Sequence, residues 1–215
     1  MDQCLESVRR HYESTISKYG ATPRGVDWPD RLSQELRFVQ LLKICNFERP
    51  LSINDFGCGY GALATFLRRR FADAAVAYKG YDFVPAMIAH AKQSTGSEKN
   101  EFFIAADCLV PADYTVASGV FNVMLGADVP TWEAYIEKTL HMLAATSSRG
   151  FSVNFLGPPH RASRRLQELY RTRPERWIGY CADAFNASVE AFGDYGLHEF
   201  TLCVRKPEIE QDDLE

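Results

Sequence analysis

The sequence of 215 residues predicts an α/β fold, in which helices cover both faces of a mostly parallel β-sheet. Two observations support this prediction. Between residues 51 and 156, short strand-like segments alternate with segments of helical periodicity, as in consecutive βαβ units. After them, residues 187–205 have the pattern of two strands joined by a turn. The sheet is therefore expected to end in an antiparallel hairpin.

Two helices are predicted ahead of the sheet. Apolar residues at steps of three or four mark one face of an amphipathic first helix: Leu5, Val8, Tyr12, Ile16 and Tyr19. A loop with several glycines and prolines follows at 20–29. The second helix is expected at about 30–45, because apolar residues again recur at helical spacing there.

The later elements follow from the same periodicities. The predicted parallel strands are 51–56, 74–82, 101–107, 115–125 and 150–156. The predicted helices between them are 62–71, 85–93, with Pro85 in its first turn, and 131–143. A polar, arginine-rich helical region is expected at 159–185, and the final strands at 187–193 and 197–205, with a turn at 194–196.

No linker or repeat divides the chain, so one domain is predicted over residues 1–205. Within it, residues 1–48 would form a helical lid and residues 49–205 the core. The stretch "KPEIEQDDLE" carries five acids, and residues 206–215 are expected to form an acidic tail.

Composition narrows the classes of protein. Hydrophobic residues make up 46% and charged residues 24%, which suffices for a substantial core. No apolar stretch approaches the roughly 20 residues of a membrane helix, and the N-terminus is too polar for a secretory signal. The net charge of −4 disfavours nucleic acid as a partner. Six cysteines without a CxxC pair indicate free thiols, a cytoplasmic location and no metal site. A monomer and a dimer both remain open.

The stretch "INDFGCGYGALATFL" (53–67) places Gly57, Gly59 and Gly61 between a predicted strand and a predicted helix, just behind Asp55. Glycines at such a turn let a ligand approach the backbone, and the helix N-terminus offers free N–H groups. Two ligand classes fit this turn. "GCGYGA" also satisfies the G-x-G-x-x-A pattern of dinucleotide-binding proteins, so the turn alone does not separate them.

Residues outside the turn separate the two classes. An acid followed by G-x-G-x-G (Asp55 to Gly61), an acid ending the second strand (Asp82) and an acidic step after the third (106–108) occur in this order. The set resembles the class I S-adenosylmethionine-dependent methyltransferases over residues 50–205. "YGATPRGVDW" and "ERWIGYCADAF" further resemble a bacterial subgroup of uncharacterised small methyltransferases. The resemblance implies a Rossmann-like sandwich with a seven-stranded, mostly parallel sheet.

The resemblance also implies how the cofactor is held. Asp82 would accept hydrogen bonds from the ribose hydroxyls, Asp107 from the adenine amino group, and Asp55 would lie near the methionyl ammonium. The implied cofactor-binding residues are Asp55, Gly57, Cys58, Gly59, Gly61, Asp82, Phe83, Met87, Ala106, Asp107, Cys108, Ser118, Gly119, Arg24 and Trp28. The resemblance to the bacterial subgroup suggests that the N-terminal helices and the loop around Arg24 and Trp28 close over the cofactor, where Arg24 could meet its carboxylate. A surface loop without a ligand role stays open as the alternative.

The acceptor is expected beyond the ends of the fourth and fifth strands. "SGVFN" replaces the N/D-P-P-Y/F motif of enzymes that methylate adenine or glutamine, so an oxygen or nitrogen of another small molecule is expected. Candidate residues of the acceptor pocket are His11, Tyr12, Tyr19, Trp28, Asn122, Asn154, His160 and Tyr180. No catalytic residue is singled out, because alignment and removal of water account for much of such a reaction.

Three alternatives stay open. Arginines 161, 164, 165, 171, 173 and 176 form either a solvated helical face or a basic rim that attracts an acidic acceptor. The protein could also bind S-adenosylmethionine or S-adenosylhomocysteine without turnover. An NAD-dependent oxidoreductase is the third alternative, although the chain has no evident second domain and no Tyr-x-x-x-Lys motif at a suitable place.

Overall fold

The computed structural model describes residues 3–95, 100–105, 108–158 and 168–207. Seven strands form one sheet: β1 (Leu51–Phe56), β2 (Val76–Asp82), β3 (Asn100–Ile104), β4 (Ala112–Ala117), β5 (Ser147–Leu156), β6 (Ser188–Phe192) and β7 (Glu199–Arg205). Their order is β3-β2-β1-β4-β5-β7-β6. The first five strands are mutually parallel, and β7 runs antiparallel to both β5 and β6. The predicted seven-stranded, mostly parallel sheet and its closing hairpin are confirmed.

Strand order reverses direction between β1 and β4, which lie side by side although β2 and β3 separate them in the sequence. In open parallel sheets, ligands bind beyond the carboxyl ends of the strands at such a switch point. The glycine turn after β1 therefore lies where the topology favours a ligand.

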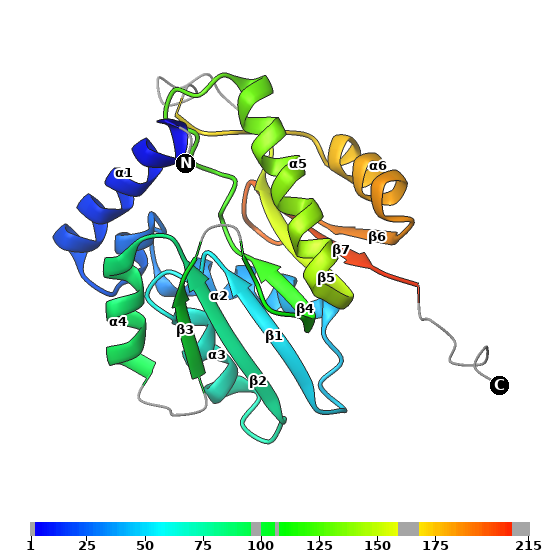
Figure 1. The fold of residues 1–215 in the computed structure, drawn as a ribbon, viewed down its shortest axis with the longest axis horizontal. Helices are drawn as coiled ribbons and strands as arrows, with labels where there is room; N and C mark the ends of the chain where they lie inside the picture. Colours follow the sequence, from blue (N-terminus) through cyan, green and yellow to red (C-terminus); the bar gives the residue numbers. More distant parts are fainter. Residues whose placement is uncertain (1–2, 96–99, 106–107, 159–167, 208–215) are drawn as a thin grey trace.

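Helices cover both faces of the sheet (Figure 1). The helices are α1 (Gln3–Tyr19), α2 (Arg31–Leu41), α3 (Ala62–Arg70), α4 (Pro85–Thr95), α5 (Val129–Thr146) and α6 (Pro174–Phe185), with short 3₁₀ turns η1 (Pro23–Val26) and η2 (Leu42–Ile44). In the view of Figure 1, α5 and α6 lie in front of the sheet and α2 and α3 behind it. None of the helices in the described part of the chain is long and apolar enough to cross a membrane.

Successive side chains of each strand point to opposite faces of the sheet, and a hydrophobic core lies on each face. Phe151, Val153 and Phe155 of β5 are fully buried on the α5 and α6 side, together with Trp132 and Trp177. The opposite face packs β1, β2 and β4 against α2 and α3, and its buried side chains include Ile53, Leu63, Phe66, Tyr78 and Val116. Two-sided burial is what the near-continuous apolar strands predict for a parallel sheet.

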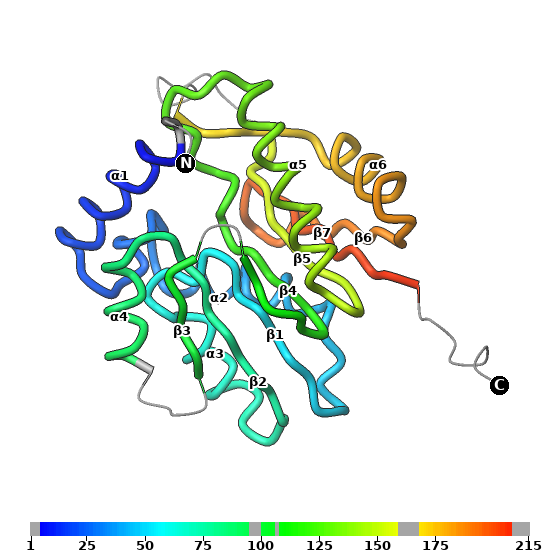
Figure 2. Tube along the Cα trace, in the orientation of Figure 1, coloured from blue at the N-terminus to red at the C-terminus, as the bar shows by residue number. Residues whose placement is uncertain are grey.

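The N-terminal helix α1 lies at the carboxyl ends of the parallel strands (Figure 1). Figure 2 shows α1 beside α4, far along the molecule from β7 near the other end of the chain. Thr15 Oγ donates a 2.8 Å hydrogen bond to the carbonyl of Gly25, which joins α1 to η1. The predicted division into a lid at 1–48 and a core at 49–205 stays a prediction, and most of the predicted acidic tail lies outside the described residues.

The predicted strand at 115–125 is wrong in its second half. Strand β4 ends at Ala117, and Gly119 then adopts a positive φ of 75°. The apolar residues that follow are buried by packing in a loop: Phe121 stacks on Phe155 with ring centroids 5.3 Å apart. The apolar residues after Ala117 were predicted as strand because a buried loop is as apolar as a buried strand.

The arginine-rich region at 159–185 is helical only in part. Helix α6 begins at Pro174, whereas Leu156 and Arg171 form a parallel bridge ahead of it. Residues 159–167 lie outside the described residues, as do Ala106 and Asp107 beyond the end of β3. Helix α2 with η2 agrees with the helix expected at 30–45, and β1 has the predicted bounds.

Candidate functional site

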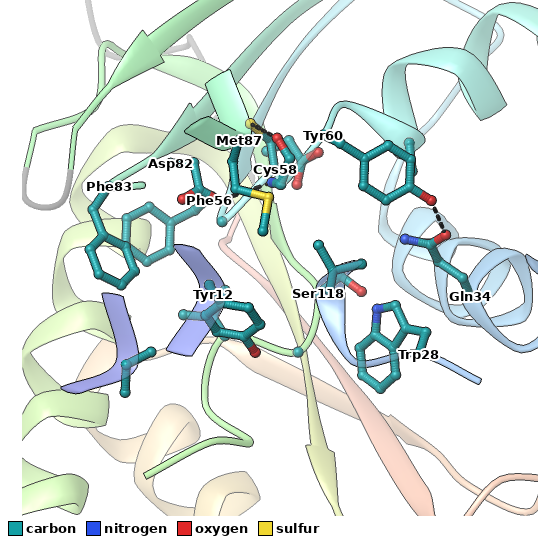
Figure 3. Close-up of a pocket in the computed structure, with 18 of the residues that line it drawn as sticks. Tyr12, Trp28, Gln34, Phe56, Cys58, Tyr60, Asp82, Phe83, Met87 and Ser118 are labelled. Carbon is teal, nitrogen blue, oxygen red and sulfur yellow. Dashed lines mark hydrogen bonds between the residues drawn. The ribbon is translucent and has the colours of Figure 1, made fainter. Parts of the chain in front are cut away.

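A pocket lies at the carboxyl ends of β1, β2 and β4 (Figure 3). Its floor consists of the strand ends and the glycine turn: Asp55, Phe56, Gly57, Cys58, Gly59, Tyr60, Ala62, Asp82, Phe83, Ser118, Gly119 and Val120. The remaining walls come from helices and their connections: Leu5, Val8, Tyr12, Val26, Trp28, Gln34, Phe38, Met87, Ala105, Trp132 and Tyr135. Residues between Leu5 and Tyr135, from α1 to α5, therefore meet at one site.

The three glycines after β1 are required by backbone conformation. Gly57, Gly59 and Gly61 all have positive φ, at 75°, 54° and 80°, which side chains rarely tolerate. The N–H groups of Gly57 and Cys58 both donate to the carbonyl of Tyr81, so the turn is anchored on β2. A Cβ on Gly57 would come within 2.5 Å of Val120 Cγ2. Gly57 and Gly59 therefore line the pocket with backbone, and at Gly57 there is no room for a side chain.

Asp82 links the glycine turn to the next strand end. Its Oδ2 accepts a hydrogen bond from the N–H of Gly59 and its Oδ1 from that of Val84, both at 2.9 Å. Burial raises the pKa of Asp82 to about 6, although these two bonds favour the charged form. Each carboxylate oxygen can accept a further hydrogen bond. Asp82 is thus held rigidly and can still receive two hydroxyl groups from a ligand.

Asp55 is the second carboxylate of the pocket. It is 2% exposed, and its Oδ2 accepts a 2.6 Å hydrogen bond from the hydroxyl of Tyr78. Burial raises its pKa to about 7. Among the described residues that line the pocket there is no Lys, Arg or His. At neutral and higher pH this pocket is therefore negatively charged and suits a cationic ligand.

The raised pKa of Asp55 makes a prediction about stability. Unfolded aspartate releases its proton near pH 3.8, whereas folded Asp55 keeps it to about pH 7. The unfolded state therefore binds fewer protons across this interval, and Asp55 lowers stability as pH rises through it. Asp55→Asn, which cannot ionise, is expected to stabilise the ligand-free protein by about 1 kcal/mol at pH 8 and to give no gain near pH 4.

Urea unfolding of both proteins at pH 4 and pH 8 measures this difference. Asp73→Asn serves as the control, because Asp73 is an exposed acid just before β2. Equal or lower stability of Asp55→Asn at pH 8 would contradict the assignment of a buried, destabilising carboxylate.

Trp28 covers the pocket from the loop after η1. A Cβ on Gly119 would lie 2.5 Å from Trp28 Cζ2, so the indole is in contact with that glycine. The guanidinium of Arg37 lies over the indole, 3.7 Å from the ring centroid. His11 Nε2 lies 2.5 Å from Asp27 Oδ2, and this hydrogen bond raises the pKa of His11. The loop that carries Trp28 is thereby fastened to α1 and α2.

A buried polar network links Arg37, which lies over Trp28, to strands β5 and β7. Arg37 Nη2 pairs with Glu199 Oε1 at 2.7 Å, and Arg37 Nε donates to Glu199 Oε2 at 3.0 Å. Asn154 Nδ2 donates to the same Oε2, while Asn154 Oδ1 accepts the N–H of Gly119 at 2.7 Å. This network connects α2, β5 and β7 to the loop after β4, which forms part of the pocket.

The structure brings most of the predicted cofactor residues together. Those that line the pocket are Asp55, Gly57, Cys58, Gly59, Asp82, Phe83, Met87, Ser118, Gly119 and Trp28. Gly61 shapes the turn without lining it, as the N-cap of α3. Arg24 and Cys108 are exposed and do not line the pocket. Ala106 and Asp107 lie outside the described residues.

The acceptor candidates are more scattered. Tyr12 and Trp28 line the pocket, whereas His11, Tyr19, Asn122, Asn154 and Tyr180 do not. Asn154 is fully buried and uses both ends of its amide within the network. Asn122 is buried, and its side-chain amide has no hydrogen-bond partner among the described residues. His160 lies outside the described residues.

Several pocket residues were not predicted. Leu5 and Val8 had been assigned to a helix face, but nothing in the sequence directs that face to the pocket. Gln34 and Phe38 are four residues apart on α2, a spacing that places them on one side of the helix. Trp132 and Tyr135 are similarly spaced on α5. Helical periodicity could have grouped each pair, but only the tertiary packing shows which surface they face.

The residues of this pocket suit a ligand with a ribose, a base and a positive charge. Asp82 can receive a ribose diol, Asp55 can receive a cation, and Met87 and Phe83 offer apolar surface to a base. The hydroxyl of Ser118 is buried with no hydrogen-bond partner in the described part of the chain. These residues fit S-adenosylmethionine, which carries a sulfonium, an ammonium and a ribose.

Comparison with known proteins finds a methyltransferase among the relatives of this chain. No family model matches the chain. The curated protein "Putative methyltransferase Rv1506c" of Mycobacterium tuberculosis is 43% identical over 166 residues, which are 77% of this chain and 99% of that protein.

Solved structures share the fold. The Burkholderia thailandensis 1,6-didemethyltoxoflavin-N1-methyltransferase, with bound S-adenosylhomocysteine, has a TM-score of 0.62 at 17% identity and matches 96% of this chain and 91% of its own. A methyltransferase from Aquifex aeolicus has a TM-score of 0.61 at 16% identity, with 89% and 97% covered. The magnesium protoporphyrin IX methyltransferase of Synechocystis, with bound S-adenosylhomocysteine, has a TM-score of 0.57 at 13% identity, with 95% and 85% covered. The chain belongs to the methyltransferases, and its fold is that of the class I S-adenosylmethionine-dependent enzymes.

Proposed function

We propose that this enzyme transfers the methyl group of S-adenosylmethionine to an oxygen or nitrogen atom of a neutral small molecule. The observation that carries the proposal is that one pocket joins two chemically different parts. The glycine turn, Asp55 and Asp82 form a polar part, and Tyr12, Trp132 and Tyr135 belong to an apolar, aromatic part. A donor and an acceptor need such adjoining sites.

The protein's contribution would be alignment and exclusion of water. When bound, the cofactor supplies an electrophilic methyl group on sulfur together with its own leaving group. Asp82 would hold the ribose, and Asp55 would offset the positive charge of the amino-acid part. Helix α1 and Trp28 cover the pocket, so an acceptor enclosed beneath them would be shielded from water. No dedicated base is required by this arrangement.

A neutral acceptor agrees better with the charges of the pocket than the acidic one considered from the sequence. Its charged lining residues, among those described, are Asp55 and Asp82, which would repel an anion. Arg171 Nη1 donates to the carbonyl of Gly157, and Arg176 pairs with Glu133 at 2.5 Å. Both arginines therefore have structural partners. Arginines 161, 164 and 165 lie outside the described residues.

A protein that binds the cofactor without turnover is the second candidate, and it would not need the apolar part. The NAD-dependent oxidoreductase alternative is set aside, since the chain belongs to the methyltransferases. The cytoplasmic location stays a prediction.

The test measures S-adenosylhomocysteine formation from S-adenosylmethionine and a metabolite extract separated into neutral and acidic fractions. The proposal expects product with the neutral fraction, and mass spectrometry to find one added methyl on oxygen or nitrogen. Turnover confined to the acidic fraction would contradict the neutral acceptor. Calorimetric binding of S-adenosylhomocysteine without turnover on any fraction would favour the binding protein instead.

A further inference from the structure

The pocket is elongated, and its two ends differ. In Figure 3, Asp82 and Phe83 lie at one end, Gln34 and Trp28 lie at the other, and Ser118 lies between them. A nucleoside whose ribose is held by Asp82 leaves the opposite end for its remaining part. The chemistry at the Gln34 end therefore decides what that part can be.

Gln34 is a buried polar residue with an unused donor. It lies on α2 and is 5% exposed. The hydroxyl of Tyr60, in the glycine turn, donates to Gln34 Oε1 at 2.7 Å. Figure 3 shows this bond on the outer side of the amide and the amide nitrogen turned toward the pocket. Within the described part of the chain, the hydrogen bond found for the Gln34 side chain is the one that its oxygen accepts from Tyr60. Because its oxygen is already bound, the amide presents its two N–H groups to a ligand.

A second unpartnered group points to the same ligand. Ser118 Oγ is buried, lines the pocket and has no hydrogen-bond partner among the described residues. Buried polar groups without partners are costly, and a ligand that bonds to them removes the cost. Gln34 can only donate toward the pocket, and Ser118 can donate as well. Two donors on the side of the pocket away from Asp82, Gln34 at its end and Ser118 nearer the middle (Figure 3), suit a group with two acceptor oxygens.

Cations that could take this role are absent from the described lining. Arg24, which the sequence suggested, is exposed and outside the pocket. Arg37 lies about one turn beyond Gln34 on α2. Its guanidinium is bound to Glu199 by two contacts, and Arg37 does not line the pocket. An anionic ligand group would therefore be met by neutral donors.

We propose that Gln34 and Ser118 bind the carboxylate of the methionyl part of the cofactor, and that Tyr60 is a positioning residue that fixes the amide of Gln34. Asp55 on the floor would lie near the neighbouring ammonium. The inference rests on the cofactor identified above and not on the proposed acceptor. It makes α2 the element that distinguishes the whole cofactor from a nucleoside without the amino-acid part.

The test compares two ligands by calorimetry: S-adenosylhomocysteine, and 5′-methylthioadenosine, which has the nucleoside thioether but no carboxylate or ammonium. Gln34→Leu is expected to weaken S-adenosylhomocysteine about tenfold and to change 5′-methylthioadenosine less than twofold, since one bond to a charged group is lost and Ser118 remains. Tyr60→Phe is expected to give a smaller loss with the same selectivity. Gln40→Leu is the matched control, because Gln40 is buried on the same helix but does not line the pocket.

A charge reversal provides an independent arm that does not depend on the leucine variant folding. Gln34→Glu should weaken S-adenosylhomocysteine more than Gln34→Leu does, while decarboxylated S-adenosylmethionine, which lacks the carboxylate, should bind at least as well as to the wild type. Equal losses for both ligands in Gln34→Leu, or no loss for either, would overturn the proposal. Failure of the wild type to bind any of these ligands would overturn the cofactor assignment, and this inference with it.

Discussion

Replacing Arg37 with methionine is expected to lower the free energy of unfolding by about 3–5 kcal/mol, because it leaves a buried carboxylate without its cation. The side chain of Glu199 is 0% exposed and that of Arg37 is 6% exposed. After the substitution, Asn154 would be the remaining described hydrogen-bond partner of that carboxylate. The contact between the guanidinium and Trp28 would also be lost. Urea unfolding at pH 7.5, with an unchanged slope, measures the effect.

Two further variants identify the cause. The double variant Arg37→Met with Glu199→Met removes both charges and should recover most of the lost stability, since buried pairs can often be replaced by apolar residues. Arg31→Met is the matched control on the same helix. The Arg31–Glu35 pair is exposed, with 64% exposure of the arginine side chain, and should contribute less than about 1 kcal/mol. A double variant as unstable as Arg37→Met would show that the cost does not come from an unpaired carboxylate.

Asp82→Ala is expected to weaken S-adenosylhomocysteine by about 1.5–3 kcal/mol, the range for a hydrogen bond to a charged group. The substitution removes the proposed acceptor of the ribose hydroxyls and the anchor of the Gly59 N–H. Calorimetry at pH 8 is the appropriate measurement, because burial raises the pKa of Asp82 to about 6 and the carboxylate is ionised there. In the wild type, affinity should fall as pH decreases through about 6.

Asp73→Ala supplies the control for this experiment. Asp73 is exposed and precedes β2, whereas Asp82 ends that strand. The control should bind S-adenosylhomocysteine as the wild type does. Wild-type affinity in Asp82→Ala would reject the ribose assignment while leaving the fold and the family unaffected.

The parts of the fold that were predicted well depend on local patterns. Strand β1 has the predicted bounds because "LSINDF" alternates and is followed at once by glycines that need positive φ. The hairpin of β6 and β7 was predicted from its turn, where Asp194 and Gly196 have positive φ. The run at 115–125 misled because apolar residues can be buried in a loop as well as in a strand, and periodicity does not distinguish the two cases.

The site was predictable to the extent that its chemistry follows the strands. Asp55 and Asp82 lie at strand ends, and parallel strands bring their carboxyl ends to one edge. Gln34 gave no such signal, because the role proposed for it depends on its hydrogen bond with Tyr60, 26 positions away in the chain. Arg24 was considered because of the resemblance and its charge, but in η1 it is exposed and lies outside the pocket. Residue type alone did not show which polar group the tertiary fold would bury.

The position of β7 has a consequence for biosynthesis. Strand β5 is complete at Leu156, but the neighbour that pairs with it begins only at Glu199, after α6 and β6 have been made. While the chain leaves the ribosome, β5 therefore presents an open edge that can pair with other nascent chains. Glu199 also follows Arg37 by 162 positions, so the ion pair that joins them can form only after β7 has begun to emerge. Pairing at this edge of the sheet is thus expected to wait until β7 has left the ribosome.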